Sequence, residues 1–474
     1  MEKREIHNLA LYIAPFGIKN LLPLISLPIF TRYILPDEFG LYALAILYGT
    51  ICSGIANFGL TGVFERTFFE IDKNKRKDLL FTVLLFVLTI SLIILLVTFY
   101  FNQYLSKIFF SPYNLNEYLF FGLLFQTTKS LNFYFILYLK SYENAKKYSY
   151  VVIIESLLIF IFSLLFVIHY SMGLYGFFIG QCLGAIITFL MIFFNVFFPL
   201  KNKFDFDLLK SQLKLSILLT PNIFFGIINS QFDRYMLGFL TLLGGVGIYD
   251  IGQKIANTSF VFLNTISNVF TPQVYKRFFS NDNKTINSVG KYLTPFFYLS
   301  TFFPLIIGIF SFEILVILTT PDYYDGAPVI SILSILYAFY FFGKQPQLIY
   351  VKKTGLISFI SFISILLNIA LNIPFIHFFG IIGAAIATCL SGIITNLMNF
   401  YYSQKHNPIN WENRVFILLG FFIVAIVSVM CLDFLNIPYL ILLLIKVVFL
   451  IGYLIFGIKY GFLSITAILK KINQ

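Results

Sequence analysis

Six basic side chains interrupt segments that are otherwise apolar enough to cross a membrane. They are Lys19, Lys129, Arg234, Lys254, Lys344 and Lys446. A charge near the centre of a bilayer costs at least about 2.5–3.5 kcal/mol, so it normally faces protein or a water-filled cavity. Lys446 could extend its side chain to place the charge at the membrane interface, and Arg234 and Lys344, which lie toward helix ends, could do so too. Fixed cations at the deeper positions would attract an anionic ligand.

Helical spacing places several of these cations on polar faces. Asp250, Lys254 and Asn257 follow one another at steps of four and three, so they share one face of a helix. Asp250 and Lys254 could neutralise each other as an i, i+4 pair, and Asn in membrane helices often only holds neighbouring helices together. The substrate-binding residues that we predict are Lys19, Lys129, Arg234, Lys254 and Asn257. The two acids that we predict to couple transport to an ion are Asp233 and Asp250.

The elements that must position these side chains are membrane-spanning helices. The chain has 474 residues, of which 59% are hydrophobic and 11% charged, and its mean hydropathy is +0.88. A soluble domain carries about 25% charged residues, and a helix needs about 20 apolar residues to span a bilayer. We therefore expect an all-α polytopic membrane protein. Fourteen suitable segments lie near residues 9–31, 40–62, 79–101, 118–139, 149–168, 173–199, 212–238, 246–270, 292–318, 328–350, 355–376, 380–402, 414–432 and 437–463.

The distribution of Lys and Arg predicts the orientation. The net charge is +12, which in a soluble protein would suggest nucleic acid. If the N-terminus is cytoplasmic, however, only Arg32 and Lys107 fall in outside loops, and most of the other cations fall in inside segments. Cytoplasmic loops carry the excess of Lys and Arg, so we expect both termini in the cytoplasm and no nucleic-acid partner.

An internal repeat predicts two similar halves. Shifting the sequence by 207 residues aligns "GLYGFFIGQCLG" (173–184) with "GIIGAAIATCLS" (380–391), and five of the twelve pairs are identical. The same shift places Gly40 on Gly247. Transporter folds often contain such repeats. We therefore expect an N-terminal lobe of six helices over 1–205, a second lobe of six over 206–405, and two added helices with the tail over 406–474.

Signals for catalysis or metal binding are weak. The four histidines have no metal-binding spacing, no phosphate-binding loop ends in Gly-Lys-Ser or Gly-Lys-Thr, and the four cysteines are scattered through apolar segments. The outside "DYYD" at 322–325 could suggest a metal-dependent glycosyltransferase, but a solvated turn is the better interpretation. We expect a non-enzyme with no catalytic residues, no metal site and no cofactor, and a membrane glycan polymerase is the alternative outside transport.

The order of the motifs resembles a known family. "TRYILPDEFGLYALA" (31–45) and "NFGLTGVFERTF" (57–68) are similar to the opening of the Wzx-type polysaccharide-biosynthesis flippases. "DRYMLGFLTLLGGVGIYDIGQKIAN" (233–257) and "GIIGAAIATCLSGIITNLM" (380–398) resemble later parts of that family. It belongs to the multidrug/oligosaccharidyl-lipid/polysaccharide exporter superfamily.

This resemblance implies a function. It implies a flippase that carries an undecaprenyl-pyrophosphate-linked oligosaccharide, such as an O-antigen, capsule or exopolysaccharide repeat unit, to the periplasmic leaflet. It implies two lobes that alternate in access around a cationic cavity, a bacterial inner-membrane location and coupling to a proton or sodium gradient. A glycan polymerase and a chain-length regulator are the partners expected beside the bilayer and the cargo. A lipid-linked peptidoglycan precursor flippase and a cation-coupled multidrug antiporter remain alternatives.

Overall fold

The described part of the chain is helical. The computed structural model describes residues 15, 17–197, 203–280, 282, 284, 287–344, 346–435 and 437–460, and no strand occurs among them. A helix satisfies its backbone N–H and C=O groups within itself, which an apolar segment needs wherever water is absent. The predicted all-α fold class is confirmed.

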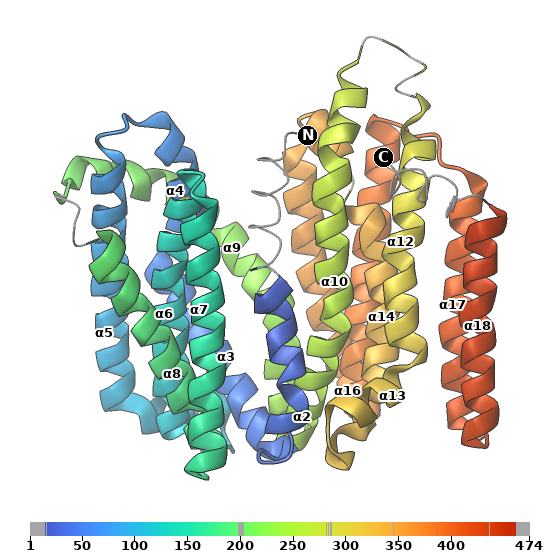
Figure 1. Cartoon of the computed structure of the whole chain (residues 1–474), viewed down its shortest axis with the longest axis horizontal. Helices are drawn as coiled ribbons and strands as arrows, with labels where there is room; N and C mark the ends of the chain where they lie inside the picture. The colour runs from blue at the N-terminus through green and yellow to red at the C-terminus, as the bar shows by residue number, and fades with distance from the viewer. Residues whose placement is uncertain are drawn as a thin grey trace. The chain divides into compact units, whose positions relative to one another are not determined.

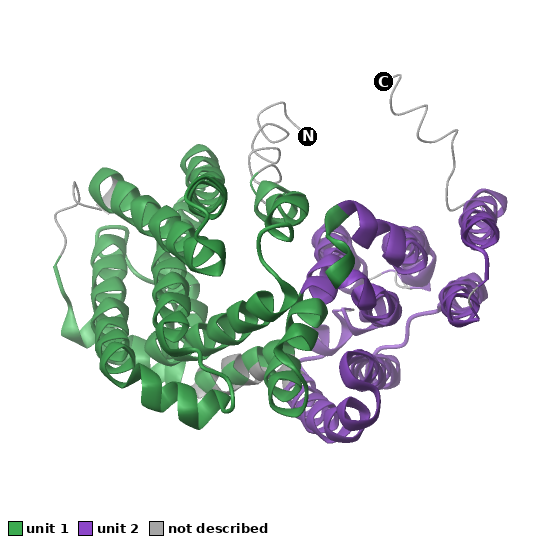
Figure 2. Ribbon diagram, turned by 90° about the horizontal axis from the view of Figure 1, so that it is seen from below, with its two compact units in different colours: residues 1–250, 318–322 green, residues 251–317, 323–474 purple. Residues whose placement is uncertain are grey.

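The chain divides into two compact units, coloured separately in Figure 2. The first comprises residues 1–250 and 318–322, and the second comprises residues 251–317 and 323–474. These units follow from contacts between residues and need not coincide with repeated halves of the sequence. The lobe boundaries near residues 205 and 405 therefore stay predictions from the repeat.

The first unit starts with a short apolar helix, Gly17–Phe30, whose last turn is α2 (Leu27–Phe30). The elements that follow (Figure 1) are α3 (Pro36–Asn57), α4 (Leu60–Glu70), α5 (Arg76–Phe110), α6 (Asn116–Ser141), α7 (Ala145–Leu164), η1 (Leu165–His169), α8 (Gly173–Ile192), η2 (Phe193–Phe197) and α9 (Phe206–Leu240). Side chains of α4, α5 and α6 form its main apolar core, with Phe64, Tyr134 and Phe135 fully buried. The long helix α10 (Leu243–Phe278) begins in this unit.

The second unit contains the remaining helices. They are the rest of α10, α12 (Val289–Ile309), α13 (Ser311–Leu318, whose last residue belongs to the first unit), η3 (Pro321–Gly326, whose first two residues belong to the first unit), α14 (Ala327–Gly343), α15 (Gln347–Tyr350), α16 (Thr354–His406), α17 (Asn413–Phe434) and α18 (Tyr439–Lys459). Its core is aromatic, and Tyr298 stacks on Tyr453 with ring centroids 4.9 Å apart.

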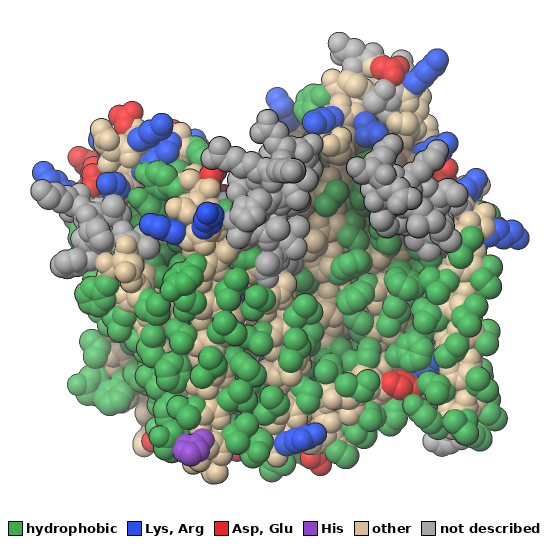
Figure 3. Space-filling model, in the orientation of Figure 1, with side chains coloured by type: hydrophobic (Ala, Val, Ile, Leu, Met, Phe, Trp, Pro, Cys, Tyr) green, Lys and Arg blue, Asp and Glu red, His purple; other side chains and the backbone are tan. Residues whose placement is uncertain are grey.

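This architecture is consistent with the prediction of about fourteen spanning helices. Nine helices of the described chain are long and apolar enough to cross a membrane, and one of them, Gly355–His406, covers the two segments expected at 355–376 and 380–402. The other expected spans are also helical, but they are shorter or more polar: Gly17–Phe30, α6, α9 and α10. In each unit, hydrophobic side chains cover the sides of the helices and Lys and Arg gather mainly at one end (Figure 3).

The start of α3 is specified locally. Pro36 occupies the first turn, where its missing N–H costs no hydrogen bond. The Glu38 carboxylate accepts a hydrogen bond from the Leu35 backbone N–H at 2.9 Å. Asp37 and Glu38 also place negative charge at the positive end of the helix dipole. The "PDEF" stretch is therefore a helix start.

Two aligned positions of the repeat, Gly40 and Gly247, take part in close backbone contacts at one corner of the first unit. A Cβ on Gly40 would collide with the backbone carbonyl of Leu243, and a Cβ on Gly247 would collide with the backbone carbonyl of Pro36. The shift of 207 residues that aligns Gly40 with Gly247 also aligns Pro36 with Leu243. Each copy thus contacts the other through the same pair of positions, as in a two-fold interface. Both positions therefore need a residue without a Cβ.

A second pair of aligned glycines shares a backbone conformation. Gly173 has φ +53° and Gly380 has φ +55°, a region that other L-residues rarely adopt. Gly173 begins α8, whereas Gly380 produces the kink that divides α16 into two halves. The same residue type at the same repeat position therefore serves the same backbone requirement.

Candidate functional site

Two predicted lysines occur together in the first unit. Lys19 lies on the short helix Gly17–Phe30 and Lys129 lies on α6. Lys19 is exposed in the structure and interacts electrostatically with both Lys129 and Glu155. The Lys129 ammonium lies over the Phe125 ring, 5.3 Å from its centroid, a favourable contact for a cation. Lys19 and Lys129 therefore lie near each other, and their assignment to the substrate stays a prediction.

A buried amide and a carboxylate complete this site. Asn132 is fully buried on α6, and its amide donates to Glu155 Oε1 at 2.9 Å and to the backbone oxygen of Ala185 at 3.2 Å. Glu155 on α7 is only 5% exposed. The side-chain oxygen of Asn132 has no hydrogen-bond partner within the described residues. We call Lys19, Lys129, Asn132 and Glu155 the lysine cluster.

The lysine cluster carries a positive surplus. Lys19 interacts electrostatically with a second cation, Lys129, and with one carboxylate, Glu155, which also accepts a hydrogen bond from Asn132. A phosphate or pyrophosphate would add the missing negative charge through charge-assisted hydrogen bonds. Sequence reasoning missed Asn132 and Glu155. An acid within the strongly apolar segment Ala145–Leu164 was the signal that could have found Glu155, because such residues are rare and usually functional.

The predicted residues on α9 and at the start of α10 form two hydrogen-bonded groups. Arg234 Nε donates to Asp250 Oδ1 at 2.6 Å, and Nη1 donates to the Gln231 side chain at 2.7 Å and to the Ser230 carbonyl at 3.1 Å. The Tyr249 hydroxyl donates to Asp233 Oδ2 at 2.9 Å. Arg234, Asp233 and Asp250 are all buried. The Asp250–Arg234 pair joins α9 to α10. The i, i+4 spacing of Asp250 and Lys254 suggests a different partner for Asp250.

The other two predicted binding residues lie in the second unit. Lys254 is half-buried and Asn257 is exposed, both on α10. Their spacing places them on adjoining positions of one helix face, as predicted. Their assignment to the substrate stays a prediction.

Lys446 is where the sequence interpretation fails. The side chain does not snorkel, since it is 1% exposed and its ammonium donates to both oxygens of Glu313, at 2.9 and 3.0 Å. Glu313 lies on α13 and Lys446 on α18. Lys446 therefore has an acid of its own and is not available to a ligand.

The Lys344 ammonium lies over the Phe260 ring, 5.0 Å from its centroid.

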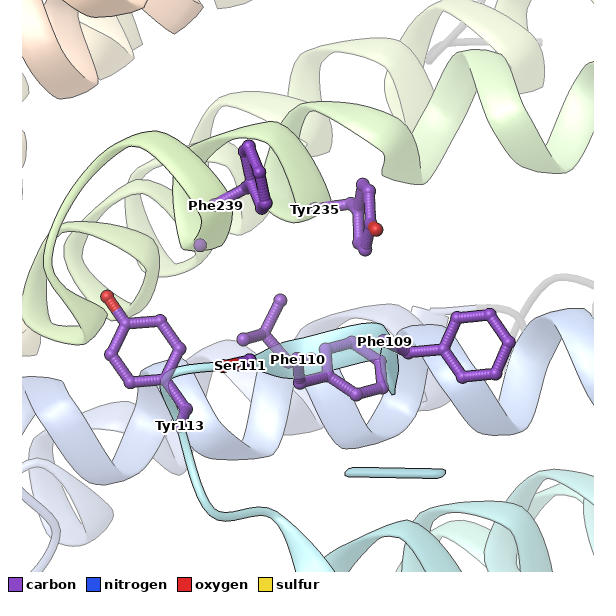
Figure 4. Close-up of a pocket in the computed structure, with 8 residues that line it drawn as sticks. Phe109, Phe110, Ser111, Tyr113, Tyr235 and Phe239 are labelled. Atoms are coloured by element: carbon purple, nitrogen blue, oxygen red, sulfur yellow. The ribbon is translucent and has the colours of Figure 1, made fainter. Parts of the chain in front are cut away.

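An aromatic crevice occurs where α5 ends near the end of α9. Phe109 and Phe110 come from the end of α5, and Tyr235 and Phe239 come from α9 (Figure 4). The Tyr113 hydroxyl donates to the Thr241 carbonyl at 2.5 Å, and burial together with the Asp37 carboxylate raises the pKa of Tyr113. The cavity measures about 10 Å³, which is room for about one water molecule. It is a gap between packed helices and is too small for a sugar.

The described residues contain no group of three or more His, Cys, Asp and Glu side chains that could hold a metal ion. The four cysteines in this part of the chain are free thiols.

Solved structures with similar folds show the fold class of the chain. Lipid II flippase MurJ, in an inward closed conformation, matches with a TM-score of 0.71 and 18% identity, over 96% of this chain and 99% of that chain. An inward-facing multidrug resistance transporter of the MATE family, in the MOP superfamily, matches with a TM-score of 0.56 and 13% identity, over 84% and 94%. The fold is that of a multi-pass membrane transporter.

The sequence comparison supplies the family. The family model described as "Polysaccharide biosynthesis protein" matches residues 6–278. A curated relative, the probable low-salt glycan biosynthesis flippase Agl15 of Haloferax volcanii, is 27% identical over 194 residues, which is 40% of each chain. That match therefore spans less than half of the relative's length. The chain belongs to the polysaccharide biosynthesis protein family.

Proposed function

We propose that this protein is a flippase that moves an undecaprenyl-pyrophosphate-linked oligosaccharide from the cytoplasmic to the periplasmic leaflet by alternating access. The cargo would be the repeat unit of an O-antigen, a capsule or an exopolysaccharide. The observation that carries the proposal is the positive surplus of the lysine cluster, where Lys19 and Lys129 share a site with one carboxylate. A lipid-linked glycan of this class is an anion at its pyrophosphate, and no bond of the cargo needs to break.

The lysines would hold the pyrophosphate and release it. A lysine is a compact point charge on a flexible stem, so it can follow a phosphate that moves. Glu155 competes with the phosphate for the same ammonium groups, which prevents the site from binding its cargo too tightly. The unpaired oxygen of Asn132 offers an acceptor to a lysine or to a sugar hydroxyl. Lys254 and Asn257 are the residues of the second unit that we assign to the cargo.

The hydrogen-bonded groups of α9 and α10 would couple transport to an ion gradient. Protonation of Asp250 would remove the carboxylate that holds Arg234 Nε at 2.6 Å and would expose a buried, uncompensated guanidinium. Asp233, which accepts from Tyr249, is the acid of the second group. Proton binding here would therefore change how α9 and α10 are held together.

The cation distribution supports a cytoplasmic position for both termini, in a bacterial inner membrane. A glycan polymerase and a chain-length regulator of the same pathway are proposed partners, because a flipped repeat unit must next be joined to others.

The alternatives differ in cargo. A cation-coupled multidrug antiporter would need an acidic interior for its cationic drugs, whereas intramembrane cations dominate in this chain. A lipid-linked peptidoglycan precursor carries the same pyrophosphate, so the lysine cluster does not separate it from a glycan repeat unit. A membrane glycan polymerase would need a catalytic group, and no observation on the described residues favours one.

The test is deletion of the gene, followed by analysis of surface polysaccharide and lipid-linked intermediates. We expect surface glycan to be lost and the pyrophosphate-linked repeat unit to accumulate on the cytoplasmic leaflet. Expression of the Lys19→Ala variant at the wild-type level should fail to restore export. Normal surface glycan together with lost dye efflux would contradict the proposal, and accumulation of a peptidoglycan precursor would favour that alternative.

A further inference from the structure

A cavity of about 240 Å³ opens between α7 and α8 in the first unit. Its lining includes Lys147, Tyr150, Val151, Ile154, Met191 and Ile192. Val151 lines it, and Glu155, one helical turn further along α7, is buried and accepts a hydrogen bond from Asn132. The cavity therefore adjoins the helix surface that carries the acid of the lysine cluster.

The walls of this cavity suit a hydrocarbon chain. Val151 and Ile192 are buried and apolar. Thr188 and Asn195 of the lining are already engaged by nearby backbone, since the Thr188 hydroxyl donates to the Gly184 carbonyl and the Asn195 amide donates to the Met191 carbonyl, each at 2.8 Å. The volume is below the roughly 300–1,000 Å³ of pockets that enclose a drug-sized ligand. It fits part of an apolar chain.

The mouth of the cavity carries a cation. Lys147 is an exposed residue in the first turn of α7, and the structure shows no carboxylate paired with it among the described residues. Lys140, Lys146 and Lys147 belong to one segment that the charge distribution assigns to the cytoplasmic side. The cytoplasmic leaflet contains anionic lipids, and basic pockets between helices on that side bind anionic headgroups.

We propose that this cavity binds an anionic phospholipid of the cytoplasmic leaflet, with part of one acyl chain between α7 and α8 and its phosphate at Lys147. The apolar walls disfavour a free phosphate, and the cation at the mouth disfavours a neutral lipid. The bound lipid would pack against the helix that presents Glu155 to the lysine cluster. The lipid composition would then affect the position of that carboxylate.

The chain offers a clean reporter for this site. Trp411 is its one tryptophan, and the indole nitrogen has no hydrogen-bond partner among the described residues, so Trp411→Phe removes no bond. Tyr150 lines the cavity and is 60% exposed, so Tyr150→Trp can be accommodated. The full chain with both substitutions, in nanodiscs, reports through quenching by brominated lipid.

We expect brominated phosphatidylglycerol to quench the fluorescence of the Tyr150→Trp reporter at a roughly fivefold lower lipid fraction than brominated phosphatidylcholine, as one lysine near an anionic surface predicts. Lys147→Gln should abolish that preference, and its neighbour Lys146→Gln, which does not line the cavity, should preserve it. Met191→Phe should reduce quenching by both lipids, whereas Leu190→Phe, an exposed neighbour outside the lining, should not.

Three outcomes would overturn the assignment. One is equal quenching by the two lipids. Another is an equal loss of preference in Lys146→Gln and Lys147→Gln, which would indicate surface charge alone. The third is displacement of brominated phosphatidylglycerol by undecaprenyl phosphate at lower concentration, which would make the cavity part of the cargo path. The measurement needs no transport, so it stands apart from the flippase proposal.

Discussion

The lysine cluster of the first unit and the Glu313–Lys446 pair of the second unit place buried charge in opposite ways. Lys446 is 1% exposed and donates to both oxygens of Glu313, and Asp433 also interacts electrostatically with both residues, so cations are not in excess there. The lysine cluster sets two cations against one acid, and that acid is bonded to a neutral amide. A matched pair holds helices together, whereas a surplus leaves charge for a ligand. We therefore expect the balance of charge, more than depth in the membrane, to distinguish a structural cluster from one that binds a ligand.

Breaking the matched pair should have the largest effect. Glu313→Ala leaves Lys446 buried without its acid, and removal of one partner of a buried pair costs about 3–5 kcal/mol. We expect a clear loss of thermal stability in detergent. The double variant Glu313→Leu with Lys446→Met should recover most of it, because apolar replacement of both partners is often neutral. Unchanged stability of the single variant would show that the pair is not structural.

Removing one cation of the surplus should affect the cargo and leave the fold intact. Lys19→Ala and Lys129→Ala should each weaken binding of a lipid-linked pyrophosphate by roughly tenfold to a hundredfold, the worth of a hydrogen bond to a charged group. Thermal stability should change little for Lys19→Ala, because that side chain is exposed. Binding to purified protein checks this, with Lys146→Ala as a matched surface control. Equal losses in the control would assign the effect to net charge.

The Arg234–Asp250 pair tests whether a buried ion pair can also act in coupling. Asp250→Asn keeps the size of the side chain but removes its charge, and Arg234 retains Gln231 and Ser230. We expect stability to fall by about 1–3 kcal/mol and flipping to lose its dependence on the proton gradient. A variant that flips with the wild-type pH dependence would confine Asp250 to a structural role.

Neutralising the acid of the lysine cluster should have the smallest effect, and it should strengthen cargo binding where loss of a lysine weakens it. Glu155→Gln keeps an oxygen for the Asn132 amide while removing the charge that competes for Lys19. The cargo should bind a few-fold more tightly and be released more slowly, since an opposing charge has been removed. Binding and single-turnover flipping, measured together, check this. Weaker binding would mean that Glu155 contacts the cargo directly.

The sequence predicts the helices well because spanning a bilayer imposes a length and an apolar composition that can be read directly. Even Gly355–His406, one continuous element in the structure, is predicted as two segments that meet at the Gly380 kink. Contacts between residues that are distant in sequence are harder to predict. The pairing of Lys446 is hidden because Glu313 lies far away in the sequence, and Glu155 is easily missed because one acid barely changes a strongly apolar segment. The 207-residue repeat is visible, but nothing in it indicates that its two copies touch.

That contact has a consequence for synthesis of the chain. Gly40 packs against Leu243, roughly 200 residues further along, and a ribosome adds about 5–20 residues per second. The N-terminal corner therefore waits about 10 to 40 s for its partner, with the surface around Gly40 uncovered. During that interval the first helices sit in the membrane without their final neighbour. A chaperone or insertase that shields this corner would have the most to protect early in translation, well before any cargo can be bound.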